Sequence, residues 1–254
     1  FLPEHGFSFN SMSTALAETL LGWYAANKRD LPWRQTSDPY VIWIAEIMLQ
    51  QTRVDSVIPY FQRWMEKFPN IASVATSTQQ EVLKLWEGLG YYARARNIYK
   101  TAQLICEQHA CIFPADYHAI KNLPGVGKAS AADIASIAFG KDVCAVDGNI
   151  RRVVSRLADL SDPLGSDALQ EAVEGFVKSH LPNGKAGDYN QAWMDIGATI
   201  CLPGKPICSR CPLTRYCVSY SRNTQTERPV RIAKPAVPVF EVAAGILQRE
   251  DGAV

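Results

Sequence analysis

Four of the seven cysteines in this 254-residue chain lie close together near its C-terminal end. The spacing is Cys-x6-Cys-x2-Cys-x5-Cys, through Cys201, Cys208, Cys211 and Cys217. Such short gaps force tight loops, so the four thiolates can converge on one centre, which indicates a metal site rather than a disulfide framework. Soft sulfur ligands select zinc or an iron-sulfur cluster, and the spacing leaves both open. A disordered cysteine-rich tail is the alternative.

The composition indicates a globular protein without a membrane partner. With 47% hydrophobic residues, the chain can bury a substantial core and divide into two lobes. Its apolar runs all fall short of the ~20 residues that span a bilayer, and residues 1–10 lack the pattern of a secretory signal. We therefore expect a soluble, intracellular monomer. Cys106, Cys111 and Cys144 are predicted to be plain buried thiols.

Hydrophobic periodicity predicts an all-α fold up to about residue 227. The first helix is expected at 13–26, with Ser13 or Thr14 as its N-cap. Prolines 39, 69, 114, 124 and 182 fall between the predicted helices, where helix breakers belong. The further helices are expected at 41–51, 54–67, 78–86, 93–109, 129–139, 149–158, 166–180 and 189–200.

Both ends of the sequence differ in character from the helical part. Residues 1–10 are expected to be an expression leader. Residues 229–238 have the composition of an extended, proline-rich linker, and residues 239–248 alternate loosely like a strand before a turn at 250–252. A lone half-hairpin is not stable by itself. We therefore expect residues 229–254 to be a linker and the start of a further, β-containing domain.

The formal charge of +1 gives no overall attraction to a polyanion, so a nucleic-acid surface would have to be a local patch. The sequence offers three candidate groups, which are Arg94, Arg96 and Lys100, then Arg151, Arg152 and Arg156, then Lys205, Arg210 and Arg215.

A glycine-containing turn separates two of the predicted helices. Gly125 and Gly127 precede Lys128, and glycines at alternate positions allow positive φ and close backbone approach. The N–H groups at the start of the following helix can then hold a phosphate. Many helix-to-helix turns contain Gly-x-Gly, so a purely structural turn is the alternative.

Two carboxylates occupy opposite kinds of sequence environment. Glu46 is the one ionisable residue in the apolar segment 41–49, where burial should raise its pKa and let it act as a general acid. The alternative is that Glu46 lies on a solvated stripe. Asp147 precedes a helix, so it is expected to be an N-cap that the helix end keeps anionic. One neutral and one ionised carboxyl suit cleavage of a glycosidic bond.

Taken together, the motifs resemble those of the MutY-type adenine DNA glycosylases of the endonuclease III, or helix-hairpin-helix, superfamily. Seven blocks occur in the same order. They are Leu-Pro-Trp-Arg at 31–34, Asp-Pro-Tyr at 38–40, Glu-Ile-Met-Leu-Gln-Gln-Thr at 46–52, Gly-Leu-Gly-Tyr-Tyr-Ala-Arg at 88–94, Leu-Pro-Gly-Val-Gly at 123–127, Val-Asp-Gly-Asn at 146–149 and the cysteine loop at 201–217.

The resemblance implies a two-lobed helical fold with DNA in the groove between the lobes. Residues 11–36 and 147–228 would form one lobe, and residues 37–146 a six-helix barrel with the helix-hairpin-helix. The cysteine loop would hold a 4Fe-4S cluster that takes no part in base cleavage. Residues 229–254 would begin a Nudix-like domain that recognises 8-oxoguanine.

The resemblance also implies roles for individual residues. Glu46 matches the residue that protonates a flipped adenine, and Asp147 the carboxylate that stabilises the cationic sugar, with Asn149 positioning Asp147 or the water. Gln51 matches a side chain that fills the vacated space in the duplex, and Tyr91 a ring that wedges beside the opposite base. The residues that match an adenine pocket are Trp33, Arg34 and Gln191. Without the resemblance, a surface amide and a packed ring would describe Gln51 and Tyr91 equally well.

One position distinguishes related activities. In bifunctional members of the superfamily a lysine forms a Schiff base with the sugar, and Ala129 stands at the matching place. Lys128 is adjacent, but neighbours on a helix are rotated by about 100°. We therefore expect a monofunctional enzyme that removes adenine opposite 8-oxoguanine or guanine in duplex DNA. Other members have a polar residue at this place, and the sequence does not show what replaces it. The alternatives are a glycosylase-lyase for oxidised pyrimidines and a non-catalytic iron-sulfur protein that binds DNA.

Overall fold

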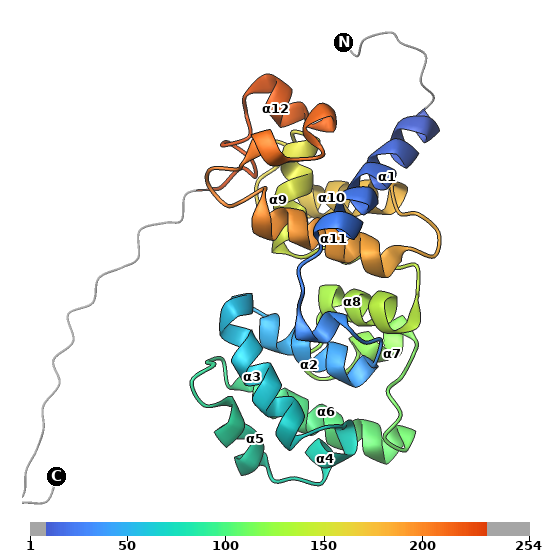
Figure 1. Cartoon of the computed structure of the whole chain (residues 1–254), viewed down its shortest axis with the longest axis vertical. Coiled ribbons are helices and arrows are strands. Elements are labelled where there is room, and N and C mark those ends of the chain that lie inside the picture. The colour runs from blue at the N-terminus through green and yellow to red at the C-terminus, as the bar shows by residue number, and fades with distance from the viewer. Residues whose placement is uncertain (1–8, 233–254) are drawn as a thin grey trace, which may run out of the picture.

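Helices make up the regular structure of residues 9–232, the part of the chain that the computed structural model describes, with side chains from residue 14 (Figure 1). The prediction of an all-α fold is confirmed, since the described residues contain one isolated bridge, Pro163 to Val230, and no extended strand. None of the helices within these residues has the length and apolar character to cross a membrane. The expected strand at 239–248 and turn at 250–252 lie outside the described residues, as does most of the expected leader.

The α-helices are α1 (Phe9–Asn27), α2 (Pro39–Leu49), α3 (Val54–Lys67), α4 (Ile71–Ala75), α5 (Gln79–Trp86), α6 (Ala93–His109), α7 (Tyr117–Lys121), α8 (Lys128–Phe139), α9 (Gly148–Leu157), α10 (Asp167–Ser179), α11 (Ala186–Thr199) and α12 (Val218–Arg222). Three short 3-10 helices are η1 (Pro32–Arg34), η2 (Cys208–Arg210) and η3 (Thr214–Tyr216).

Most predicted helices occur where hydrophobic periodicity places them. The helices at 54–67 and 93–109 have the predicted bounds, and the other long ones differ by a few residues. The predicted cap of the first helix is wrong, because α1 already begins at Phe9. Ser13 and Thr14 therefore lie inside the helix.

Three helices that the periodicity does not predict are five residues long, which is too short for a 3.6-residue repeat to be recognised. Two of them carry local capping signals. Asn70 and Ser73 form a capping box at the start of α4, and the Asp116 side chain accepts a hydrogen bond from the backbone N–H of Ala119 at the start of α7. For these two short helices, the capping residues indicate the helix start, whereas hydrophobic periodicity does not.

Two hydrophobic clusters divide the core, and α8 belongs to both. In Figure 1, α2 to α7 form one group of helices and α1 with α9 to α12 form the other, with α8 between them. Ala131, Ile134 and Ala135 of α8 pack in the first cluster, whereas Ala132 packs in the second. The largest fully buried side chains of the clusters are Trp43, Trp64 and Trp86 in the first and Tyr189 and Trp193 in the second.

Cys106 and Cys111 form a disulfide, so the prediction that both are plain thiols is wrong. The backbone after α6 explains the pairing. Ala110 and Cys111 adopt left-handed conformations, with φ of 50° and 61°, which turn the chain back against the last turn of α6. Cys144 is a free thiol and half-buried.

Arg94 is a buried structural residue and is not part of a DNA-binding patch, contrary to the sequence prediction. Its Nη1 donates to the carbonyls of Ile47, Met48 and Gln50 at distances of 3.0, 2.7 and 2.7 Å. These carbonyls end α2, where no helical N–H remains to pair with them. The guanidinium of Arg94 therefore caps α2 from α6, a role that only the packed structure defines.

Replacing Arg94 with Ala should lower the free energy of unfolding by about 3 kcal/mol, because the buried carbonyls at the end of α2 would lose their donors. Denaturant titration of the folded chain measures the change. Arg96→Ala is the matched control, since Arg96 is exposed on the same helix and its loss should change stability by about 0.5 kcal/mol or less. Equal effects of the two substitutions would contradict the capping role.

Candidate active site

A pocket of about 440 Å³, partly open to solvent, lies between η1, α2, α8 and α11. The structure brings four of the predicted site residues to its wall, namely Trp33, Arg34, Glu46 and Gln191. The rest of the lining consists of Arg29 and of apolar side chains, which are Leu31, Ile42, Leu49, Val54, Ile137 and Met194. A mostly apolar pocket with a few polar groups is the usual form of a site for a small ring.

Glu46 carries the acidic group of this pocket. Its neighbours in α2, from Ile42 to Met48, are buried, and Glu46 itself is half-buried at the pocket wall. Burial, followed by the negative charge of Asp147, raises the pKa of Glu46 to about 7, while the positive charge of Arg34 opposes the shift. A protonated Glu46 therefore exists at neutral pH, as the apolar segment predicts. The alternative of a solvated helix stripe does not fit this position.

Asp147 is the N-cap of α9, as predicted. One carboxylate oxygen accepts a hydrogen bond from the backbone N–H of Ile150 at 2.7 Å, and the other accepts from Asn149 Nδ2 at 2.9 Å. Both donors and the positive end of the helix stabilise the ionised form. The predicted contact between Asn149 and Asp147 is thus present in the structure.

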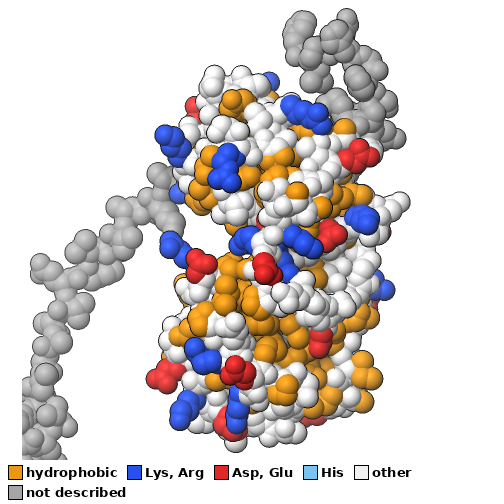
Figure 2. Space-filling view, in the orientation of Figure 1, with side chains coloured by type: hydrophobic (Ala, Val, Ile, Leu, Met, Phe, Trp, Pro, Cys, Tyr) orange, Lys and Arg blue, Asp and Glu red, His pale blue; other side chains and the backbone are white. Residues whose placement is uncertain are grey.

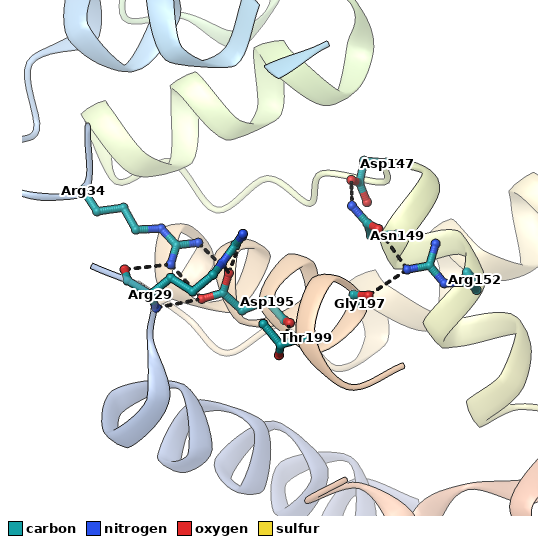
Figure 3. Close-up of polar contacts among 8 residues, drawn as sticks. All are labelled: Arg29, Arg34, Asp147, Asn149, Arg152, Asp195, Gly197 and Thr199. Carbon is teal, nitrogen blue, oxygen red and sulfur yellow. Dashed lines mark hydrogen bonds and ion pairs between the residues drawn. The ribbon is translucent and has the colours of Figure 1, made fainter. Parts of the chain in front are cut away.

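Asn149 continues into a polar chain that leads away from the pocket (Figure 3). Its Oδ1 accepts from Arg152 Nη2 at 2.9 Å, and the same nitrogen donates to the carbonyl of Gly197 at 2.8 Å. Arg152 Nε donates to the carbonyl of Cys201 at 2.9 Å. A Cβ at Gly197 would lie 2.7 Å from Asn149 Cβ, so this close approach of α9 and α11 requires glycine.

Asp195 on α11 was not found by the sequence analysis. Its side chain is fully buried and pairs with two arginines, Arg29 and Arg34 (Figure 3). Arg34 binds both of its oxygens, at 2.7 and 2.9 Å. Although burial favours the neutral acid, the hydrogen bonds and charges of the arginines hold the pKa of Asp195 below its ordinary value. This pairing fixes the Arg34 guanidinium at the pocket wall.

Gln51 and Tyr91 line a second, open hollow of about 680 Å³ together with Gln50 and Tyr92. Both residues have left-handed backbones, with φ of 56° and 49°, a conformation that costs energy for residues with a side chain. Tyr91 is 61% exposed, which excludes the alternative of an ordinary packed ring. The structure therefore presents an amide and an aromatic ring side by side on an exposed rim.

The glycine turn before α8 has one residue that requires glycine. Gly125 has a φ of +78°, and a Cβ there would lie 2.8 Å from Asn97. Gly127 has a φ of −83°, so it does not use the positive φ that a glycine allows. Gly127 is the N-cap of α8, and as a glycine it has no side chain with which to cap the helix. Lys128 is exposed and pairs with Glu174 at 2.6 Å.

The four clustered cysteines line one hollow of about 330 Å³. All four are free thiols, and no three of them lie close enough within the described chain to share a single metal ion. The hollow is formed by the end of α11, η2, η3 and the start of α12. Arg156 Nη1 donates to Cys201 Sγ at 3.3 Å and to the carbonyl of Leu202 at 2.7 Å.

The three candidate basic groups differ in accessibility. Arg156 is 3% exposed and Arg152 is held by backbone carbonyls, so these two arginines are structural and do not form the predicted patch. Figure 2 shows Lys and Arg side chains scattered among acidic ones, several of them near the level where the two groups of helices meet. The exposed candidates that remain are Arg96, Lys100, Lys205, Arg210 and Arg215.

The fold and these motifs match known proteins. Residues 44–178 match the family described as "HhH-GPD superfamily base excision DNA repair protein". The chain therefore belongs to the HhH-GPD superfamily.

Individual relatives extend the match. An adenine DNA glycosylase of Buchnera aphidicola subsp. Acyrthosiphon pisum is 40% identical over 87% of this chain and 64% of its own length. A solved thermostable thymine-DNA glycosylase is 32% identical, with a TM-score of 0.73, over 84% of this chain and 98% of its own. An endonuclease III solved in a DNA complex is 22% identical, with a TM-score of 0.72, over 86% of this chain and 100% of its own, which shows the fold.

The resemblance to adenine DNA glycosylases is thus confirmed at the level of sequence similarity. The chain spans about two fifths to two thirds of the length of these curated relatives, from 39% of the Arabidopsis thaliana protein to 64% of the Buchnera protein.

Proposed function

We propose that this chain is the base-excising part of an adenine DNA glycosylase, which removes adenine opposite 8-oxoguanine or guanine from duplex DNA. The observation that carries the proposal is the pair of carboxyls at the pocket. Glu46 has a pKa of about 7 at the pocket wall, and Asp147 accepts two hydrogen bonds nearby. One proton donor and one anion are what acid-assisted cleavage of a glycosidic bond needs.

In this mechanism adenine leaves the base stack and enters the pocket lined by Trp33, Arg34 and Gln191. Glu46 donates its proton to a ring nitrogen of adenine. The bond between the base and the sugar breaks, and its electron pair leaves with the neutral base. Asp147 stabilises the positive charge on the sugar. Water then attacks the sugar and releases a proton, which restores the acid form of Glu46.

The exposed rim around the pocket suits contact with a distorted duplex. Gln51 would fill the space that the flipped adenine leaves, and Tyr91 would stack beside the opposite base, as their exposure and shared hollow allow. Gly125, Gly127 and Lys128 would bring the start of α8 to a phosphate. The bound form would be one copy of this chain on one mispaired site.

The two hydrophobic clusters support a two-lobed organisation around this groove. We assign residues 11–36 and 147–228 to one lobe, residues 37–146 to the helical barrel, and residues 229–254 to a linker and the start of a Nudix-like domain. Leu31 and Trp33 pack in the first cluster, with the barrel. These residues therefore connect the lobes at the pocket, where Arg34 also bonds to α11.

We propose that Cys201, Cys208, Cys211 and Cys217 hold a 4Fe-4S cluster. Four free thiols that line one hollow supply the ligand type and number that such a cluster needs. The cluster would hold together the loop that carries Lys205 and Arg210. Arg152 and Arg156 support this loop by donating to its carbonyls.

The isolated chain should contain iron and sulfide, about four of each per chain, and no stoichiometric zinc. Cys208→Ser should lower the iron content and the stability of the loop, because one thiolate ligand is lost. Cys144→Ser is the control, since Cys144 lies outside the hollow. Elemental analysis gives the result, and a colourless zinc protein without iron would contradict the assignment.

Adenine should be released from duplexes with adenine opposite 8-oxoguanine or guanine, and not from duplexes with oxidised pyrimidines or with thymine opposite guanine. Glu46→Gln should slow release by about 100-fold or more while duplex binding is retained, because the amide has no proton to transfer. Single-turnover release and binding titrations measure the two effects.

The alternatives predict other outcomes in the same experiment. A non-catalytic DNA-binding protein would show no release and no effect of Glu46→Gln. A glycosylase-lyase would give an efficient covalent DNA adduct with borohydride, whereas Ala129 offers no amine for one.

The rate of adenine release should fall as pH rises through the pKa of Glu46, about 7. The protonated form is the active one, so the rate should approach a decrease of about tenfold per pH unit well above this value. A pH series of single-turnover rates tests the expectation, with unfolding followed at each pH as the control. A rate that rises through this range would show that Glu46 acts as a base in the rate-limiting step.

A further inference from the structure

A third carboxyl lies beside the two already described. Asp133 on α8 is 2% exposed, and its Oδ1 is buried with no hydrogen-bond partner. Aspartates this deeply buried are normally paired or hydrogen-bonded. Asp195, the other buried aspartate of this region, has two arginine partners. Asp133 therefore needs a different explanation.

The position of Asp133 on α8 places it on the side of the pocket. Ile137, one turn later on the same helix face, lines the pocket with Glu46. Ala129, one turn earlier on this face, has no polar group. The carboxyl of Asp133 thus supplies a polar group on this helix face, one turn after the apolar Ala129.

Only negative groups act on Asp133 from the elements around it. Glu46 of α2 and Asp147 at the start of α9 both disfavour its ionisation, in addition to its burial, and its pKa is raised well above the ordinary value. On α7, His118 and Lys121 are exposed. On α11, Asp188 is exposed and Asp195 is paired with arginines. With no cation opposite it, the neutral form of Asp133, which is a hydrogen-bond donor, is favoured.

We propose that Asp133 is a positioning residue of the active site, whose neutral carboxyl donates a hydrogen bond, directly or through one water, to the Glu46 carboxylate after Glu46 has released its proton. This inference rests on the proposed function. Deprotonated Glu46 would otherwise lie near the Asp147 carboxylate in a weakly solvated pocket, where Arg34, the cation that acts on it, is already paired with Asp195. A donor to its charged form lowers the cost of giving up the proton and so makes Glu46 a stronger acid in the cleavage step.

The test compares Asp133→Ala and Asp133→Asn in single-turnover adenine release across pH. The alanine variant has no donor at this position. The pH at which its rate falls on the alkaline side should therefore be higher by about one unit, and its plateau rate should be lower. The asparagine variant keeps an N–H donor of similar size, so its profile should stay close to that of the unchanged chain.

Other outcomes would overturn the proposal. If Asp133 were ionised, both variants would move the fall to lower pH, since a negative neighbour of Glu46 would be lost. If Asp133 were only structural, both variants would lower stability or rate without moving the profile. Ser136→Ala is the matched control for this case, because Ser136 is also buried on α8 and bonds to Asn190.

A measurement that does not use activity separates this inference from the proposed function. The infrared difference spectrum between the unchanged chain and Asp133→Asn should show a protonated carboxyl at neutral pH. A carboxylate signal there instead would refute the proposal even if adenine is released. If the unchanged chain does not release adenine, the proposed function is refuted. The infrared spectrum still shows in that case whether the Asp133 carboxyl is protonated.

Discussion

The pocket depends on carboxyl groups that share one weakly solvated region with few positive charges. Glu46 and Asp147 lie close enough for the charge of one to affect the ionisation of the other. The N-terminal end of α9 favours the anion at Asp147, while burial favours the neutral acid at Glu46. The helix end and the apolar wall thus place two chemically similar groups in different environments. Asp133 is a third carboxyl in this region, and burial together with the charges of Glu46 and Asp147 raises its pKa.

Arginines in this protein serve mainly to satisfy backbone carbonyls and buried carboxylates. Arg94 caps α2, while Arg152 and Arg156 hold the cysteine loop to α9. Arg29 and Arg34 neutralise Asp195. Buried cations with several acceptors are costly to remove because the acceptors lose their only donors. Fewer basic residues are therefore exposed than the sequence contains.

The polar contacts of α9 connect the site to the cysteine loop. Asp147 bonds to Asn149, and Asn149 bonds to Arg152 (Figure 3). Arg152 also donates to the carbonyl of Cys201. The orientation of the Asp147 carboxylate and the position of the loop are thus parts of one arrangement. Gly197 permits it, since a side chain there would collide with Asn149.

The sequence by itself determined the local features of this protein. Periodicity placed the long helices, an apolar segment marked Glu46 as an acid with a raised pKa, and the residues after Asp147 marked it as an N-cap. The order of the motifs identified the superfamily. These features depend on neighbouring residues, so they can be read along the chain.

Tertiary structure decided the features that depend on distant segments. Asp195 looks like one polar residue in a buried helix until Arg29 and Arg34, more than 160 positions earlier, pair with it. Arg94 resembles a DNA-binding residue until α2 ends against it. The pKa of Asp133 is raised only because α8 packs beside Glu46 and Asp147 and buries the carboxyl. Burial and charge act through space, and the sequence lists neither the partners nor the distances.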